Sequence, residues 1–309
     1  MKNALIIVLG VVIIALVAFM LLRPSNTPVP LTPPTDTETP VATEPTDVPS
    51  EPVAQAPQDT SPKPTSVIGS SIEERDITAY HFGTGDTEVL FVGGMHGGYS
   101  WNTTVVAYEL INYLKKNPTA VPENVKVTVI PVLNPDGLMK VAGKTEGVTR
   151  ADIPAGADAT VPGRFNGRTV DLNRNFDCDW KASGTWQNRT VSGGTKAFSE
   201  PESQALRDYV NANTPSAVVV WYSAAGGVYS SNCYNGVLPE TKTLTNLYAD
   251  ASGYPAHEEF NYYEITGDAV NWLAKMNIPA ISVLLTTHED AEWEKNKKGI
   301  EAILSHYAE

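Results

Sequence analysis

The chain has 309 residues, a formal net charge of −13 and 42% apolar residues. This length accommodates one large domain or two small ones. Because phosphate binding requires a surplus of Lys and Arg, the acidic balance argues against a nucleic acid partner. The two cysteines, Cys178 and Cys233, are too few for a disulfide framework. They either form one bridge outside the cytosol or remain reduced thiols.

The N-terminus carries an apolar segment, Ala4–Leu22, that contains no charged residue. Its 19 residues would rise about 28 Å as a helix, close to the hydrocarbon thickness of a bilayer. The segment ends in bulky residues before Arg23, which is a poor signal-peptidase site. We therefore predict an uncleaved transmembrane anchor over residues 1–23 and a single-pass protein of the cell membrane.

Residues 24–65 are rich in Pro, Thr, Val, Ala and acidic side chains. This composition buries too little apolar surface to offset chain entropy, so it predicts a disordered stalk. The charge rule for membrane orientation compares Lys2 with Arg23 and gives nearly a tie. The stalk and the long C-terminal part favour an extracytoplasmic domain over residues 66–309.

From residue 66 the composition is that of a folded domain. Apolar runs predict strands at Glu88–Val92, Val125–Val132, Ala217–Tyr222 and Ala280–Leu285. Helical spacing and capping signals predict helices at Thr104–Lys116, Ser199–Asn213 (with Ser199 as N-cap), Gly267–Lys275 and Trp293–Tyr307. Alternating buried strands and helices predict an α/β fold with a mixed, largely parallel central sheet flanked by helices.

A series of short motifs lies along the predicted domain. They read GGMHGG (Gly93–Gly98), NPDG (Asn134–Gly137), RFNGRTVDLNRNF (Arg164–Phe176), FSEPES (Phe198–Ser203), WYSAAGG (Trp221–Gly227), YEITGDAVNW (Tyr263–Trp272) and ISVLLTTHEDAEW (Ile281–Trp293). Their order and spacing resemble the zinc metallocarboxypeptidases of the carboxypeptidase A/B type. The resemblance covers the chain after residue 70, and the pair DLNRNF and NPDG is its most specific part.

The resemblance implies a zinc ion held by a His and a Glu of an early motif and by a second His of a later strand. A further Glu near the last strand would activate the zinc-bound water. His96 matches the first ligand. The positions of the Glu ligand, the second His and the catalytic Glu are occupied by Tyr99 or Ser100, Tyr222 and Leu284, respectively.

These replacements lack the chemistry that the zinc site requires. Leucine cannot act as a base, and a phenol with a pKa near 10 is a poor zinc ligand. A single imidazole does not hold zinc tightly, because affinity comes from several converging ligands. We therefore expect a degenerate metal site. His257 or His288 with Glu289 would be the substitutes, but ordinary loop residues are the favoured interpretation.

The substrate-binding side matches the family better. By resemblance, Asn173 and Arg174 bind the terminal carboxylate of the peptide, and Arg164 faces the oxyanion. Tyr263 matches the mobile tyrosine that closes over the substrate, and Val270 lies where relatives line the side-chain pocket, which disfavours a basic terminal residue. The motifs before the two cysteines meet near this pocket in the family, which makes a bridge between them a hypothesis.

The favoured hypothesis is a membrane-anchored, catalytically impaired carboxypeptidase-like domain. It would bind a peptide C-terminus, such as that of a peptidoglycan-derived peptide. The alternative is an active zinc metallocarboxypeptidase with atypical ligands. A serine hydrolase with Ser223, Asp268 and His288 is less favoured, because Trp221 and Ala225 stand where a nucleophile elbow needs glycine. A purely structural role with a vestigial pocket also stays open.

Overall fold

The computed structural model describes residues 63–308. Its strands are β1 Thr65–Ser70, β2 Asp76–Phe82, β3 Thr87–Val92, β4 Val125–Ile130, β5 Ser183–Trp186, β6 Arg189–Ser192, β7 Ala217–Ser223, β8 Gly227–Ser230, β9 Ala256–His257 and β10 Ala280–Leu285. Its α-helices are α2 Trp101–Lys116, α3 Pro135–Ala142, α4 Ala157–Thr160, α5 Pro201–Asn213, α6 Pro239–Ser252, α7 Ala269–Lys275 and α8 Trp293–His306.

Within residues 63–308 the central sheet has eight strands in the order β1-β2-β4-β3-β7-β10-β8-β9, and β5 and β6 form a separate hairpin. The middle strands β4, β3, β7 and β10 are parallel to one another, whereas β2 and β8 join them antiparallel. Residues of β7 and β10 are buried on both faces, as expected for parallel strands covered by helices. The predicted α/β fold with a largely parallel sheet is confirmed.

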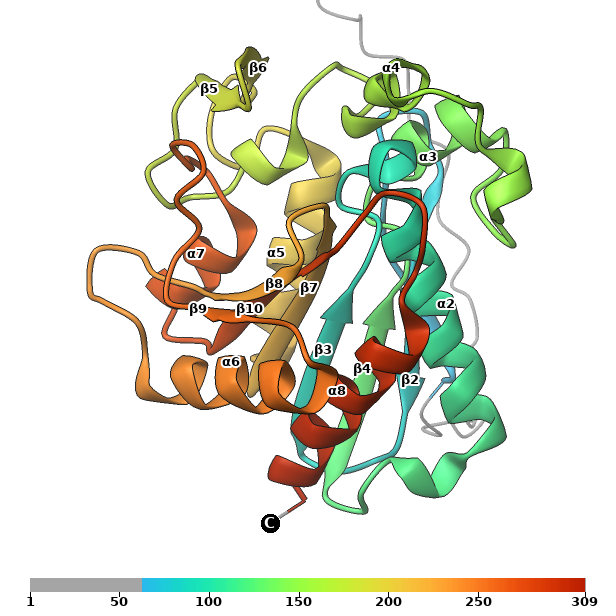
Figure 1. The fold of residues 1–309 in the computed structure, drawn as a ribbon, viewed down its shortest axis with the longest axis vertical. Helices are drawn as coiled ribbons and strands as arrows, with labels where there is room; N and C mark the ends of the chain where they lie inside the picture. The colour runs from blue at the N-terminus through green and yellow to red at the C-terminus, as the bar shows by residue number, and fades with distance from the viewer. Residues whose placement is uncertain (1–62, 309) are drawn as a thin grey trace, which may run out of the picture. The chain divides into compact units, whose positions relative to one another are not determined.

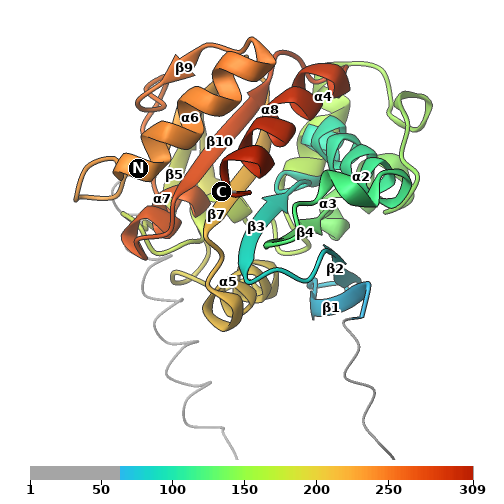
Figure 2. The same cartoon turned by 90° about the horizontal axis from the view of Figure 1, so that it is seen from below.

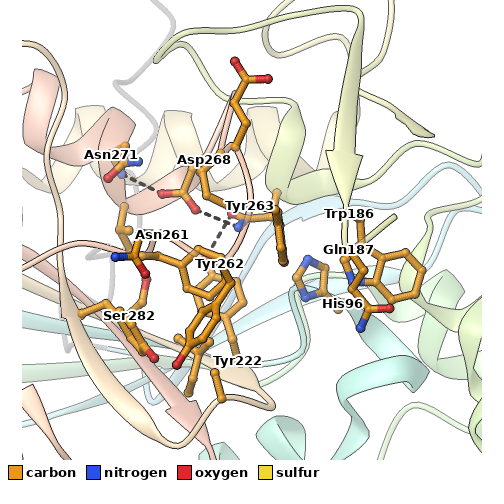
Figure 3. A pocket seen from close by; sticks show the side chains of 18 of the residues that line it. His96, Trp186, Gln187, Tyr222, Asn261, Tyr262, Tyr263, Asp268, Asn271 and Ser282 are labelled. Carbon is orange, nitrogen blue, oxygen red and sulfur yellow. Dashed lines mark hydrogen bonds between the residues drawn. The ribbon is translucent and has the colours of Figure 1, made fainter. Parts of the chain in front are cut away.

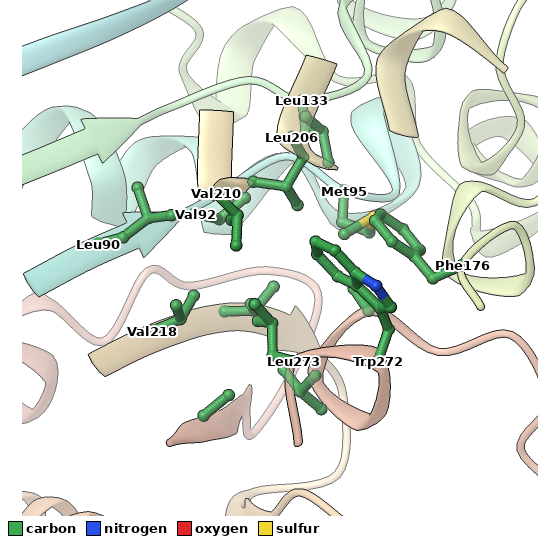
Figure 4. Packing of buried hydrophobic residues seen from close by; sticks show 14 of the residues in the cluster. Leu90, Val92, Met95, Leu133, Phe176, Leu206, Val210, Val218, Trp272 and Leu273 are labelled. Atoms are coloured by element: carbon green, nitrogen blue, oxygen red, sulfur yellow. The ribbon is translucent and has the colours of Figure 1, made fainter. Parts of the chain in front are cut away.

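Helices cover both faces of the sheet (Figures 1 and 2). Helices α2, α6 and α8 lie on one face, and α5 and α7 lie on the other. On the α5 and α7 side, Trp272 and Phe176 pack near Met95 at the end of β3, as Figure 4 shows. Phe176 follows directly on the DLNRN motif, so this core fixes the base of the loop that carries the candidate pocket residues.

The sequence prediction missed several elements and misplaced one cap. Helix α5 begins at Pro201 with Glu200 as its N-cap, whereas Ser199 was expected in that role. The Ser199 hydroxyl instead donates to Oε1 of Glu200 at 2.7 Å, so it satisfies a side chain and not the helix end. Helix α3 begins inside the NPDG motif, where Asn134 accepts a hydrogen bond from a backbone N–H as N-cap.

The predicted anchor over residues 1–23 and almost all of the predicted stalk lie outside the described residues. Within residues 63–308 no helix is long and apolar enough to cross a membrane. The longest helix of this range, α2, has 16 residues and would span about 24 Å, short of the roughly 30 Å of a bilayer core. The assignment to the cell membrane as a single-pass protein is therefore corrected and is not retained.

The two cysteines form a disulfide bridge between Cys178 and Cys233, with a Cα–Cα distance of 6.1 Å. Both side chains are buried. The bridge joins the segment after the DLNRN motif to the loop after β8, as the hypothesis from the motifs anticipated. The two cysteines are 55 sequence positions apart, so the bridge cross-links two segments that are distant in the sequence.

Replacing both cysteines by serine should lower the free energy of unfolding by about 4 kcal/mol, the chain-entropy value for a loop of this length. Chemical denaturation with and without a reductant measures the effect. The reductant should destabilise the wild type and leave the double Ser variant unchanged. Equal stability of reduced and oxidised wild type would contradict a structural role of the bridge.

Candidate functional site

A cleft of about 1130 Å³ opens beside the carboxyl ends of β3, β7 and β10. Ligands bind at this edge of open α/β sheets, where loops leave adjacent parallel strands. Figure 3 shows how the side chains are distributed along the cleft. His96, Trp186 and Gln187 lie at one end, Asp268, Asn271 and Ser282 lie at the other, and Tyr222, Tyr262 and Tyr263 lie between them.

His96 follows β3 and is buried at the floor of the cleft. The chain turns at Gly97, where φ is +42° and a Cβ would lie 2.7 Å from a backbone carbonyl oxygen, so only glycine fits. Nε2 of His96 lies 3.3 Å from Oδ1 of Asp171, and Nδ1 has no hydrogen-bond partner among the described residues. Burial and the positive charge of Arg164 lower the pKa of His96 to about 4. The imidazole is therefore neutral at pH 7.

Arg164 and Asp171 form a buried ion pair. Nε and Nη2 of Arg164 lie 2.9 and 2.8 Å from the same carboxylate oxygen, Oδ2 of Asp171. Trp186 packs against the guanidinium, with 4.4 Å between Cζ and the ring centroid. Burial would raise the pKa of Asp171, but Arg164 and His96 hold it well below its ordinary value. The charge of Arg164 is thus neutralised within the protein, and its oxyanion role stays a prediction.

The side chain of Asn173 is held by three protein groups. Its Nδ2 donates to Oδ2 of Asp268 at 2.8 Å. Its Oδ1 accepts from the hydroxyl of Tyr222 at 2.9 Å and from the backbone N–H of Ala269 at 3.1 Å. Burial and the negative charge of Asp268 raise the pKa of Tyr222 well above its ordinary value, so the phenol is neutral and acts as a donor. The residue at the second-histidine position therefore orients Asn173.

Arg174 is buried in the cleft, and within residues 63–308 it makes no ion pair. Nη1 donates to the carbonyl of Asn173 at 2.7 Å, and Nη2 donates to the carbonyl of Thr185 at 2.8 Å. Nε is buried and has no hydrogen-bond partner in the described part of the chain. Tyr263 lies nearby, with 5.8 Å between its ring centroid and Cζ of Arg174. Arg174 and Tyr263, which the resemblance places around the peptide terminus, thus face the same cleft.

The replaced metal and base positions also lie at the cleft. Leu284 on β10 is the direct register partner of Tyr222 on β7, and both line the cleft with His96. Tyr99 lines the same end, with 5.0 Å between its ring centroid and that of Trp186. Ser100, the residue before α2, is buried and is not among the side chains that line the cleft.

Ser223, Asp268 and His288 line the same cleft, but no hydrogen bond joins them in the described residues. The Ser223 hydroxyl donates to Oδ1 of Asn102 at 2.9 Å. The ring of His288 packs against Tyr99, with 4.4 Å between centroids. The contacts of a serine hydrolase triad are therefore not formed.

His288 lies in the loop after β10, as expected, but it is half-buried and lines the cleft, so it is not an ordinary surface residue. Sequence reasoning also missed Trp186, which no motif contains. The contact between Asp268 and Asn173 was missed as well, since 95 positions separate the two residues. Only the N-cap role of Asp268 leaves a local signal, the Asp followed by a helical pattern.

The side chains at the expected metal position do not fit a zinc ion. Among residues 63–308 no group of three or more His, Cys, Asp and Glu side chains is placed to hold a metal. Asp171 is already paired with Arg164, and Tyr222 is a neutral hydrogen-bond donor to Asn173. A zinc site needs three converging donors, whereas this floor offers one free imidazole nitrogen beside a guanidinium.

The fold, the cleft and the motifs define a carboxypeptidase-like domain, and the chain belongs to the zinc carboxypeptidase family, whose sequence model matches residues 54–294. Curated relatives include metallocarboxypeptidase A of Trichophyton tonsurans, 31% identical over 131 residues, which are 39% of this chain and 29% of that protein. A zinc carboxypeptidase of Simulium vittatum is 29% identical over 150 residues, 46% of this chain and 47% of that protein. The matched segments thus span less than half of each relative.

Solved structures share the fold at low sequence identity. The murein-tripeptide amidase MpaA of Escherichia coli O157 superposes with a TM-score of 0.55 at 19% identity, over 80% of this chain and 92% of that one. Carboxypeptidase A of Helicoverpa armigera superposes with a TM-score of 0.59 at 20% identity, over 79% of this chain and 69% of that one.

Proposed function

We propose that this domain binds the C-terminal carboxylate of a peptide and is impaired in metal-dependent hydrolysis. The observation that carries the proposal is Arg174, a buried guanidinium that lines the cleft and makes no ion pair in the described residues. A buried charge without a counter-charge is costly, and a carboxylate from the ligand would relieve this cost. The planar guanidinium matches a carboxylate bidentately.

Asn173 has a different place in this proposal from the one that the resemblance implies. Its side-chain oxygen Oδ1 accepts two hydrogen bonds from protein groups, and its side-chain nitrogen Nδ2 donates one. It therefore holds the pocket wall, its backbone carbonyl accepts from Nη1 of Arg174, and the main carboxylate contact falls to Arg174. Tyr263, whose ring lies beside Arg174, would cover the bound terminus.

Impaired hydrolysis follows from the donor chemistry at the cleft floor. Leu284 provides no base, and among residues 63–308 no second and third metal ligand lie beside His96. A peptidoglycan-derived peptide is the proposed partner class, supported by the fold shared with a murein-tripeptide amidase and by motifs of peptide-end recognition.

Metal analysis together with peptide binding tests the proposal. After incubation with ZnCl₂ and gel filtration, the purified protein should hold far less than one zinc per chain. It should bind acetyl-Ala-Ala-norleucine more tightly than the matching C-terminal amide, with or without EDTA, and should leave the peptide intact. An active metallocarboxypeptidase serves as the positive control for hydrolysis.

Stoichiometric zinc together with release of the terminal residue would overturn the impaired-enzyme proposal and establish the alternative, an active peptidase with atypical ligands. Equal binding of acid and amide would remove the carboxylate-binding proposal and favour a vestigial pocket.

A further inference from the structure

A series of hydrogen bonds outside the cleft, here called the Ser66 network, links a serine to a buried carboxylate. The hydroxyl oxygen of Ser66 on β1 lies 2.8 Å from Nε2 of His81 on β2. Nδ1 of His81 lies 3.1 Å from the hydroxyl oxygen of Thr128 on β4. This hydroxyl donates to Oε1 of Glu88 on β3 at 2.5 Å. The network thus crosses four neighbouring strands, beginning at the edge strand β1 (Figure 2), and none of its residues lines the cleft.

The hydrogen bonds of the network assign the proton of the His81 ring. Glu88 is the acceptor at the end of the network, and its Oε2 pairs with Nζ of Lys126 at 2.9 Å. The Thr128 hydroxyl has a single hydrogen, which it donates to Glu88, so toward His81 it can only accept. Nδ1 of His81 therefore carries the proton, and Nε2 presents its lone pair to the hydroxyl of Ser66.

The imidazole of His81 is a neutral base at pH 7. Burial and the positive charge of Lys126 lower its pKa, and the negative charge of Glu88 opposes this shift. Tyr209 of α5 stacks on the imidazole, with 6.3 Å between ring centroids, and its hydroxyl donates to Oε1 of Glu88 at 2.5 Å. Glu88 is buried, whereas Ser66 and His81 are half-buried. The network therefore has a buried acidic end and a serine that solvent reaches.

The backbone next to Ser66 offers a hydrogen-bond donor. β1 is the outermost strand on this side of the sheet. The backbone N–H of His81 donates to the carbonyl of Pro64 at 2.9 Å. In the alternating pattern of an antiparallel pair, the backbone of Ser66 then faces β2 and the N–H of Val67 faces the unpaired edge. The N–H of the residue after a nucleophile is a donor that serine hydrolases use to stabilise an oxyanion.

We propose that Ser66 is an activated nucleophile and a site of covalent acylation by a small activated carboxylic ester. Oγ of Ser66 attacks the carbonyl carbon of the ester, and its proton passes to Nε2 of His81. The bond from this carbon to the leaving alcohol then breaks, the alcohol takes the proton from His81, and the acyl group remains on Ser66. A nucleophile, a base within hydrogen-bond reach and a third group that orients the base are the parts that this chemistry requires.

The alternative is that the Ser66 network only fastens the edge strand β1 to the sheet. In that case Ser66 would react no faster than another exposed serine. Ser70 is a matched reference for this comparison, because it lies on the same strand and is exposed. Within residues 63–308 no hydrogen bond joins the side chain of Ser70 to a histidine.

The test treats the folded protein with 4-nitrophenyl acetate and measures the rate of acetylation at each serine by peptide mass spectrometry. Ser66 should be acetylated at least about 100-fold faster than Ser70, the lower end of what a general base contributes. His81→Gln removes the base and should slow acetylation of Ser66 by about the same factor. Thr128→Val should slow it less, because the base remains. Ser70→Ala should leave the rate at Ser66 unchanged.

Equal rates at Ser66 and Ser70 in the folded wild type would overturn the proposal. Fast acetylation of Ser66 that persists in His81→Gln would also overturn it, because exposure alone would then explain the reaction. Circular dichroism establishes that this variant is folded. If it does not fold, wild-type protein unfolded in urea takes its place. Unfolding dismantles the network, so acetylation of Ser66 should fall to the rate of Ser70.

Discussion

Replacing Arg174 by methionine is expected to weaken binding of acetyl-Ala-Ala-norleucine about 30-fold or more, because truncating one partner of a buried hydrogen-bonded charge pair costs about 2–5 kcal/mol. Binding of the C-terminal amide should change little. The variant should fold as well as the wild type, because it removes a buried charge that makes no ion pair in the described residues. Calorimetric titration of both peptides measures the effect.

Arg174→Lys is the matched control. It keeps the positive charge but loses the planar fork, so it should recover only part of the affinity. If Arg174→Met binds the acid as the wild type does, the carboxylate is held elsewhere in the cleft.

Asp171→Ala is expected to lower the free energy of unfolding by about 3–5 kcal/mol, since it leaves the buried charge of Arg164 without its partner. Urea denaturation followed by tryptophan fluorescence measures this change. Removing both charges, with Arg164→Met and Asp171→Leu, should recover most of the loss, because two apolar groups replace the pair.

Arg164 and Arg174 of the RFNGRTVDLNRNF motif should therefore behave differently. Arg164 matters mainly for stability, whereas Arg174 matters mainly for binding. A loss of stability in Arg174→Met as large as that in Asp171→Ala would contradict this division.

Sequence reasoning located the central strands because β3, β4, β7 and β10 are apolar runs with a local signal. It missed α3 because its starting residues read as a family motif, although Asn134 and Pro135 are also a helix start. It also missed β1 and β2, whose burial is partial and mixed. These strands depend on pairing at the sheet edge, which no short window of sequence contains.

The candidate site, too, was predictable from the sequence only in part. The motifs of His96, Tyr222 and Leu284 brought these residues to one cleft, because each ends a strand or follows one. Arg174 lines the same cleft from the short helical turn Leu172–Arg174. The partners of these residues were not predictable. Whether an arginine is paired depends on contacts across the fold, and Arg164 and Arg174 look alike until the position of Asp171 is known.

The register of β7 and β10 constrains how this site can change. Tyr222 and Leu284 are direct neighbours on adjacent parallel strands, both buried. A lone Tyr222→His loses the donor to Asn173, and a lone Leu284→Glu places a carboxylate in a buried position without a metal to face it. Each single change toward a zinc ligand set therefore costs stability before the set is complete. A metal site on this floor would require several of these residues to change together.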